Sequence, residues 1–286
     1  MFKKRYYYLV AGFADLIFDS GKGYPDLMEF REELKNNLHP SDYHLVSLLF
    51  LPYDNDNMIA FLENKTDSWN ALGNYSLEDF EEEKNVLQSI IKMKDILPPY
   101  MVKVMARHII EEHSFDRVSL WKDLTEGYIE MVLNSGNNFL KKWISFDRDV
   151  RNIFTLVNAK ELDLDAERYI TGNDPFAQEL IYIFNSGRDF MVPQEPEYAP
   201  SVFRIATENE FIDKERKIDL ERWNFIDTVT FFEYFTIDLI LGYLIKYKIV
   251  LRWKQLDPET GEMMLRKMIE QMEKQVIITE KTIEEY

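Results

Sequence analysis

The sequence predicts an all-α protein made of several helical lobes, with little or no β structure. Three observations indicate this fold class: apolar residues recur at helical spacing along most of the chain, capping residues precede these stretches, and alternating apolar patterns are short. The chain has 286 residues, of which 46% are hydrophobic and 30% are charged. This is a globular composition, and the length provides ample material for a buried core.

The first half of the chain contains two well-marked helix starts. Ser41, which follows Pro40, is expected to cap a helix over residues 42–51. Ser76 is expected to cap a helix that runs to about residue 96. Acidic residues fill the first turn of this second helix, where the helix dipole favours negative charge.

The helical signals continue through the middle of the chain. Ser119 and Asp174 are expected N-caps, Pro175 stands at a first helical position, and Gly187 suits a helix end. Together with the spacing of the apolar residues, these signals predict helices over residues 100–113, 121–133 and 138–162, and a further one from Pro175.

The most apolar window, residues 228–253, is long enough to cross a bilayer. Five charged residues lie inside it, and each would cost about 2.5–3.5 kcal/mol near the bilayer centre. We therefore predict a largely buried helix of a water-soluble protein and no transmembrane segment. Asp238, Gly242 and Lys246 follow one another at four-residue intervals and form a polar stripe on this helix. The stripe is interpreted as a solvent-facing edge, and the alternative is a close contact with a neighbouring helix or a partner at Gly242.

A proline-rich stretch over residues 192–200 contains three prolines and is predicted to be a stiff surface linker. It divides the chain into a larger helical region, residues 1–191, with more than one lobe, and a C-terminal helical region, residues 201–286, that packs back on the rest. Residues 144–163 and 235–257 each read as an apolar helix followed by Lys-x-Leu-Asp. Repeated helical lobes would produce this similarity between the two segments, although it could also arise by chance.

Composition excludes several classes of function. The chain has 34 Lys and Arg against 51 Asp and Glu, a net charge of −17, so nucleic acid is not expected as its main partner and a basic protein is favoured. The sequence contains no cysteine, which removes disulfides, thiolate nucleophiles and metal–thiolate sites and fits a reducing compartment. The N-terminus does not resemble a secretory signal. We therefore expect a cytoplasmic protein.

No motif in the sequence concentrates a catalytic mechanism. His108 and His113 are five residues apart, so they do not share a helix face as a chelating pair four residues apart would. The acidic runs at residues 78–83 and 208–221 are interpreted as external, and the alternating charges of residues 147–151 as surface ion pairs. No catalytic, cofactor-binding or metal-binding residue is predicted.

Aromatic residues are in excess, at 14% of the chain. Their densest groups lie at residues 6–8 and 231–235. Core packing explains most of them, and the surplus would supply anchors for a protein partner, because Tyr and Trp are enriched at interfaces. The candidate interaction surface comprises the following residues: Tyr7, Tyr8, Asp238, Gly242 and Lys246.

Two segments resemble a known family. Residues 7–12, which read YYLVAG, resemble a family of uncharacterised bacterial proteins associated with V-type ATPases, and the start of the C-type subunits of V/A-type rotary ATPases, which are called d-type in eukaryotes. Residues 235–259 are similar to the long helix and closing turn of that family. Gly12 and Phe13 stand where the family carries a basic residue, and the middle of the chain does not match the family, so no binding residue is transferred.

The resemblance implies a non-catalytic, all-helical structural component that couples the central stalk to the membrane rotor ring. The implied partners are the central-stalk subunits and the rotor ring, and the implied location is cytoplasmic and peripheral to the inner membrane. Two alternatives remain open: a helical adaptor or regulator unrelated to the ATPase, and an enzyme with an unmarked acidic site. The enzyme hypothesis predicts a deep pocket in which at least two carboxylates converge.

Overall fold

The computed structural model describes residues 4–18, 24–89, 95–110, 116–186 and 193–255. Within these ranges the chain forms α-helices and two short 3-10 helices, and no strand. The prediction of an all-α fold is therefore confirmed. The α-helices are α1 (Tyr7–Ala11), α2 (Leu27–Asn37), α3 (Pro40–Leu48), α4 (Leu51–Leu62), α5 (Leu77–Gln88), α6 (Pro99–Ile110), α7 (Arg117–Leu133), α8 (Asn138–Glu161), α9 (Pro175–Asn185), α10 (Ala199–Ala206), α11 (Phe211–Thr230) and α12 (Ile237–Gln255).

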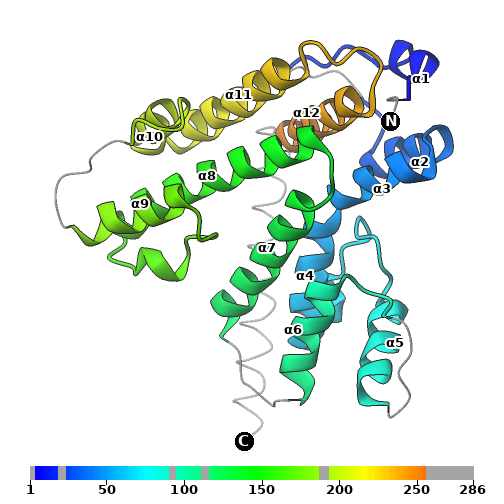
Figure 1. Cartoon of the computed structure of the whole chain (residues 1–286), viewed down its shortest axis with the longest axis horizontal. Coiled ribbons are helices and arrows are strands. Elements are labelled where there is room, and N and C mark those ends of the chain that lie inside the picture. The colour runs from blue at the N-terminus through cyan, green and yellow to red at the C-terminus, as the bar shows by residue number, and fades with distance from the viewer. Residues whose placement is uncertain (1–3, 19–23, 90–94, 111–115, 187–192, 256–286) are drawn as a thin grey trace, which may run out of the picture.

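The helices form two groups that meet at α8. Figure 1 shows α8, α11 and α12 lying across one end of the molecule, while α4, α5, α6 and α7 extend away from them. Helix α8 packs against α7 on one side and against α9, α10, α11 and α12 on the others. It is therefore the central element of the fold.

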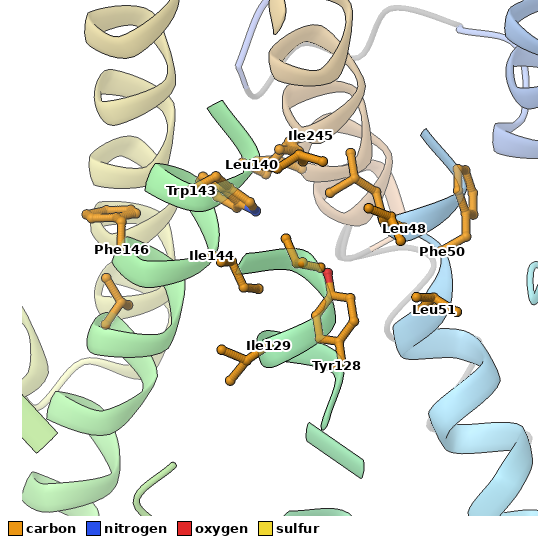
Figure 2. Close-up of a cluster of buried hydrophobic side chains, with 14 of the residues drawn as sticks. Leu48, Phe50, Leu51, Tyr128, Ile129, Leu140, Trp143, Ile144, Phe146 and Ile245 are labelled. Atoms are coloured by element: carbon orange, nitrogen blue, oxygen red, sulfur yellow. The ribbon is translucent and has the colours of Figure 1, made fainter. Parts of the chain in front are cut away.

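The core lies where these two groups face each other. Figure 2 shows Trp143 and Ile144 of α8 on one side, Leu48 and Leu51 of α3 and α4 on the other, and Tyr128 of α7 between them. All five side chains are at most 7% exposed. Removing such apolar surface from water is the main favourable term in folding, at about 25 cal/mol per Å².

Two of the predicted helix starts match the structure closely. Ser76 caps α5 in a reciprocal capping box with Asp79, and Asp174 caps α9 by accepting a hydrogen bond from the Phe176 amide. Helix α5 ends at Gln88, earlier than the predicted end near residue 96. The predicted helix end at Gly187 lies outside the described residues.

Two other predicted caps are wrong. His39, not Ser41, caps α3, because Pro40 already occupies the first helical turn and the His39 ring accepts from the Ser41 amide. Asp116, not Ser119, caps α7, since its carboxylate accepts from the Val118 and Ser119 amides. In both cases the capping side chain lies at the position before the helix, where its acceptor reaches the free amides of the first turn.

The apolar window at residues 228–253 does not form one helix. Helix α11 ends at Thr230, and a turn precedes the start of α12 at Ile237. Among the described residues, no helix combines the length and the apolar character that a membrane crossing requires.

The proline-rich stretch leads directly into a packed helix. Pro200 lies in the first turn of α10, which packs against α8 and α11. The Tyr198 hydroxyl donates a hydrogen bond of 2.6 Å to Asp149 Oδ2 on α8. Helices α10, α11 and α12 all contact α8, so the part of the C-terminal region that the structure describes shares a core with the preceding helices. The internal repeat stays a prediction, because its second copy extends past residue 255.

Candidate functional site

Five exposed aromatic side chains gather where α1 meets the turn between α11 and α12. We call this surface the aromatic tip, and its members are Tyr7, Tyr8, Phe231, Phe232 and Tyr234. Tyr8 is 97% exposed and Phe232 is 79% exposed. Large apolar side chains at this exposure lose the free energy that burial would give, and clusters of them mark interaction surfaces.

The backbone brings the two parts of the tip together. The Tyr6 amide donates a hydrogen bond of 2.7 Å to the Phe235 carbonyl oxygen, and the Tyr7 and Phe235 rings lie 4.8 Å apart between centroids. Arg5 also donates to the Tyr234 carbonyl oxygen. These contacts join segments from opposite ends of the described chain.

Two local features fix the shape of the tip. Phe235 has a φ of 59°, a left-handed conformation that is unfavourable for a bulky residue and persists only where its surroundings impose it. The Tyr6 hydroxyl donates to Asp42 of α3. Partial burial and this bond raise the pKa of Tyr6 to about 12. The tip is therefore held on α3 as well as on the turn.

The polar stripe on α12 lies inside the molecule. Asp238 is 4% exposed and accepts a hydrogen bond of 2.6 Å from the Asn137 side chain. A Cβ added to Gly242 would lie 2.9 Å from Ile226 and 3.0 Å from Thr230 of α11. The interpretation of the stripe as a solvent-facing edge is wrong, and the alternative of a close helix contact at Gly242 is the one observed.

Lys246 joins the same two helices closer to the surface. Its ammonium pairs with Asp227 of α11, whose side chain is 58% exposed, and lies 4.6 Å from the centroid of the Trp223 ring. Of the five candidate interaction residues, the structure brings Tyr7 and Tyr8 into one exposed surface and places Asp238, Gly242 and Lys246 at packing contacts between helices.

A second feature, which no sequence pattern indicated, is a cavity of about 1050 Å³ that is lined by residues from both helix groups. Tyr128, Trp143, Ile144 and Ile245, all labelled in Figure 2, contribute to its wall. Eight charged side chains also line this central cavity. They are Arg151, Arg222, Lys248, Arg252 and Lys254, with Asp26, Asp147 and Asp219.

Buried ion pairs connect two of these carboxylates. Arg222 of α11 lies between them, with its Nε 3.0 Å from Asp147 Oδ1 and its Nη1 3.1 Å from Asp219 Oδ1. Arg151 pairs with the other oxygen of Asp147, and Arg252 with the other oxygen of Asp219. The network therefore ties α8, α11 and α12 together.

Asp147 has the electrostatics of a permanent carboxylate. Burial acts to raise its pKa, but Arg151 and Arg222 outweigh it and lower the pKa to about 2. A carboxylate that stays ionised throughout the neutral range is no proton donor, and its oxygens are already occupied by guanidinium groups.

Asp54 is the opposite case, because burial raises its pKa to about 6. That value would suit acid–base chemistry. However, Asp54 is fully buried and accepts from the amides of Asn74 and Tyr75 and from the Asn74 side chain. Its carboxylate therefore serves to hold the loop before α5.

Several acidic residues interpreted as external are buried. Glu83 is fully buried and accepts from the amides of Ile96 and Leu97. Asp147 and Asp149 are each 5% exposed, and Asp219, in the run 208–221, is 1% exposed. The interpretations of these residues as solvated charges are wrong. Inside the fold, each carboxylate accepts hydrogen bonds from backbone amides or pairs with charged side chains.

The sequence does contain an indication that Asp147 is buried. It lies four residues after Trp143 and three before Val150, and both of these are buried on α8. Helical spacing therefore places Asp147 on the apolar face. A charged residue on such a face indicates a buried partner, and here the partners come from α8 itself and from α11.

The described residues contain no group of three or more His, Asp or Glu side chains arranged to hold a metal ion. His113 lies outside the described residues. His39, by contrast, acts as the N-cap of α3.

Comparison with known proteins relates the chain to a family. The family model described as "Protein of unknown function (DUF2764)" matches residues 3–276. No curated protein and no solved structure matches the chain.

Proposed function

The chain belongs to the DUF2764 family, described as proteins of unknown function, and we propose that it is a non-catalytic structural component of a V/A-type rotary ATPase. In this role it couples the central stalk to the membrane rotor ring, as the C-type subunits do. It would then lie on the cytoplasmic side of the inner membrane, attached through the ATPase complex.

The observation that carries the proposal is the aromatic tip. The two segments that resemble the C-type subunits, residues 7–12 and 235–259, begin at the two parts of the chain that meet there. A protein that transmits force needs a rigid body with a well-defined contact surface. The tip offers such a surface, because exposed aromatic rings are typical anchors of protein interfaces.

The chemistry of the central cavity supports a non-catalytic role. Two of the three carboxylates in the cavity wall converge, as the enzyme hypothesis requires, but these two, Asp147 and Asp219, are both held by arginines. A general acid needs a proton to give near neutral pH, and a general base needs a free oxygen lone pair that can accept one. Asp147 is ionised, with a pKa of about 2, and both of its oxygens are already paired with arginines.

Co-purification tests the proposal. A tagged copy at native expression level is recovered from detergent-solubilised membranes, and the captured proteins are identified by mass spectrometry. We expect the central-stalk subunits and the rotor ring. We also expect the double variant Tyr8→Ser/Phe232→Ser to capture less of these proteins by a factor of about ten or more, because buried aromatic anchors typically dominate interface energetics.

Tyr182→Ser is the matched control. Tyr182 is 70% exposed on α9, which Figure 1 shows at the opposite end of the molecule from α1. This variant should capture the stalk and the ring as the wild type does. Capture of neither the stalk nor the ring by the wild type would overturn the proposal. If instead a different protein were captured while ATPase assembly proceeded normally without this chain, the adaptor alternative would be selected.

A further inference from the structure

We infer that the central cavity is a binding site for a small phosphate-bearing anion and that Lys248 provides its main counter-charge. This inference is independent of the proposed function. It concerns the interior of the isolated chain, whereas the coupling role rests on the aromatic tip.

The first argument is the local charge. The chain as a whole has a net charge of −17, yet five basic side chains and only three carboxylates line the cavity. Charge of the opposite sign to the whole protein is concentrated in one concave space. Such a site attracts anions, because low-dielectric walls strengthen the field inside it.

The second argument is that the carboxylates in the wall are already engaged. Both oxygens of Asp147 and both oxygens of Asp219 face guanidinium groups, and Asp219 Oδ2 also accepts a hydrogen bond of 2.8 Å from Trp253 Nε1. Asp26 caps α2 by accepting from the Glu29 amide. These carboxylates are therefore committed to other donors.

Lys248 has no counter-ion among the described residues. Its ammonium donates one hydrogen bond of 3.0 Å to the Leu49 carbonyl oxygen and lies 4.7 Å from the centroid of the Tyr53 ring. In the part of the chain that the structure describes, no carboxylate pairs with it. An ammonium has three N–H donors, so a ligand entering the cavity would find unused donors on Lys248.

The energetics of Lys248 agree with this geometry. Burial lowers the pKa of its ammonium to about 8, with the charge of Asp147 acting in the opposite direction. A partly buried cation held by one carbonyl and by ring faces has lost part of its hydration without gaining a full ion pair. A bound anion would supply that pair.

The lining also restricts the chemistry of the ligand. Several cations around one space favour a multiply charged anion, and a guanidinium group such as that of Arg151, which pairs with Asp147 through one nitrogen, matches the oxygens of a phosphate with its other donors. The Arg151 side chain lies partly exposed, with 45% of it accessible. Tyr24, Tyr53 and Trp143 add aromatic surface suited to an organic group. A volume of about 1050 Å³ accommodates a ligand of nucleotide size.

Titration calorimetry on the isolated full-length chain tests the inference, with inorganic phosphate, pyrophosphate and ATP as separate probes. We expect at least one of them to bind. Binding of all three would identify the phosphate group as the part recognised, and binding of ATP alone would show that the organic group is needed. Lys248→Met should weaken binding by about tenfold or more, while Lys248→Arg should retain most of it.

Lys246→Met is the matched control, because it removes the same charge from the same helix. Lys246 pairs with Asp227 and does not line the cavity, so its loss should leave binding within about twofold of the wild type. Lys248→Met is expected to melt no lower than the wild type, since a buried neutral side chain replaces a poorly paired cation. Absence of binding by every probe, or equal weakening by the two methionine variants, would overturn the inference.

Discussion

The aromatic tip and the central cavity place side chains in opposite environments. At the tip, apolar rings such as Tyr8 and Phe232 face water. In the cavity, charged groups such as Asp147 and Asp219 are withdrawn from it. Exposed rings forgo hydrophobic stabilisation, and buried ions lose hydration. Neither arrangement is the one that would be expected if folding stability alone had shaped the chain.

The two regions differ in how they are supported. The cavity network belongs to the core, because its ion pairs join α8, α11 and α12. The tip is attached at its base through Tyr6 and Phe235, while its outer rings pack against little else. Substitutions in the ion-pair network should therefore lower stability, and substitutions at the tip should change binding without changing stability.

The largest effect is expected for Asp219→Ala. Its removal leaves Arg222, Arg252 and Trp253 without a shared acceptor inside the fold. Breaking a buried ion pair on one side typically costs about 3–5 kcal/mol. Urea unfolding followed by circular dichroism measures the loss.

Glu32→Ala is the control for Asp219→Ala. Glu32 pairs with Lys35 on α2, and both side chains are 56% exposed. Such surface pairs contribute less than about 1 kcal/mol. A similar loss in both variants would contradict the structural distinction between the network and the surface.

A pH dependence of intermediate size is expected from Asp147. Its pKa of about 2 in the folded chain lies below the ordinary value of 3.8. The carboxylate therefore adds stability that is complete above that ordinary value and is lost as the pH falls towards 2. The shift corresponds to about 2 kcal/mol. Unfolding free energies of the wild type and of Asp147→Asn, measured between pH 5 and pH 2, should converge by this amount. Parallel curves would show that the ion pairs do not hold the proton off Asp147.

Local rules predicted the parts of this structure that depend on neighbouring residues. The Ser76 cap and the start of α9 at Pro175 follow from hydrogen bonds within four residues, and helical spacing identified the long α8. The all-α fold class follows from the same signals. The sequence also indicated part of the aromatic tip, because Tyr7 and Tyr8 belong to one of the densest groups of aromatic residues in the chain.

What the sequence did not reveal depends on contacts between distant segments. The charges around Asp147 were interpreted as surface pairs, since nothing near them in the sequence shows that Arg222 lies opposite. Lys248 was counted only as a charge that opposes membrane insertion, and its place in a cavity depends on how α12 packs against α3 and α8. The central cavity depends on the register in which the helices pack against each other. That register is set by contacts in the core between distant segments, which local sequence patterns do not show.

The smallest effect on stability is expected at the tip, and it separates the two regions most sharply. Phe232 is 79% exposed and Tyr8 is 97% exposed, so Tyr8→Ser/Phe232→Ser removes little buried surface. Its free energy of unfolding should stay within about 0.5 kcal/mol of the wild type. Urea unfolding of the isolated chain measures this directly. A loss of several kcal/mol would mean that the rings pack within the fold. An unchanged stability together with lost capture of the stalk and the ring would mean that these rings act on a partner, because a folded chain that no longer binds has lost only its contact surface.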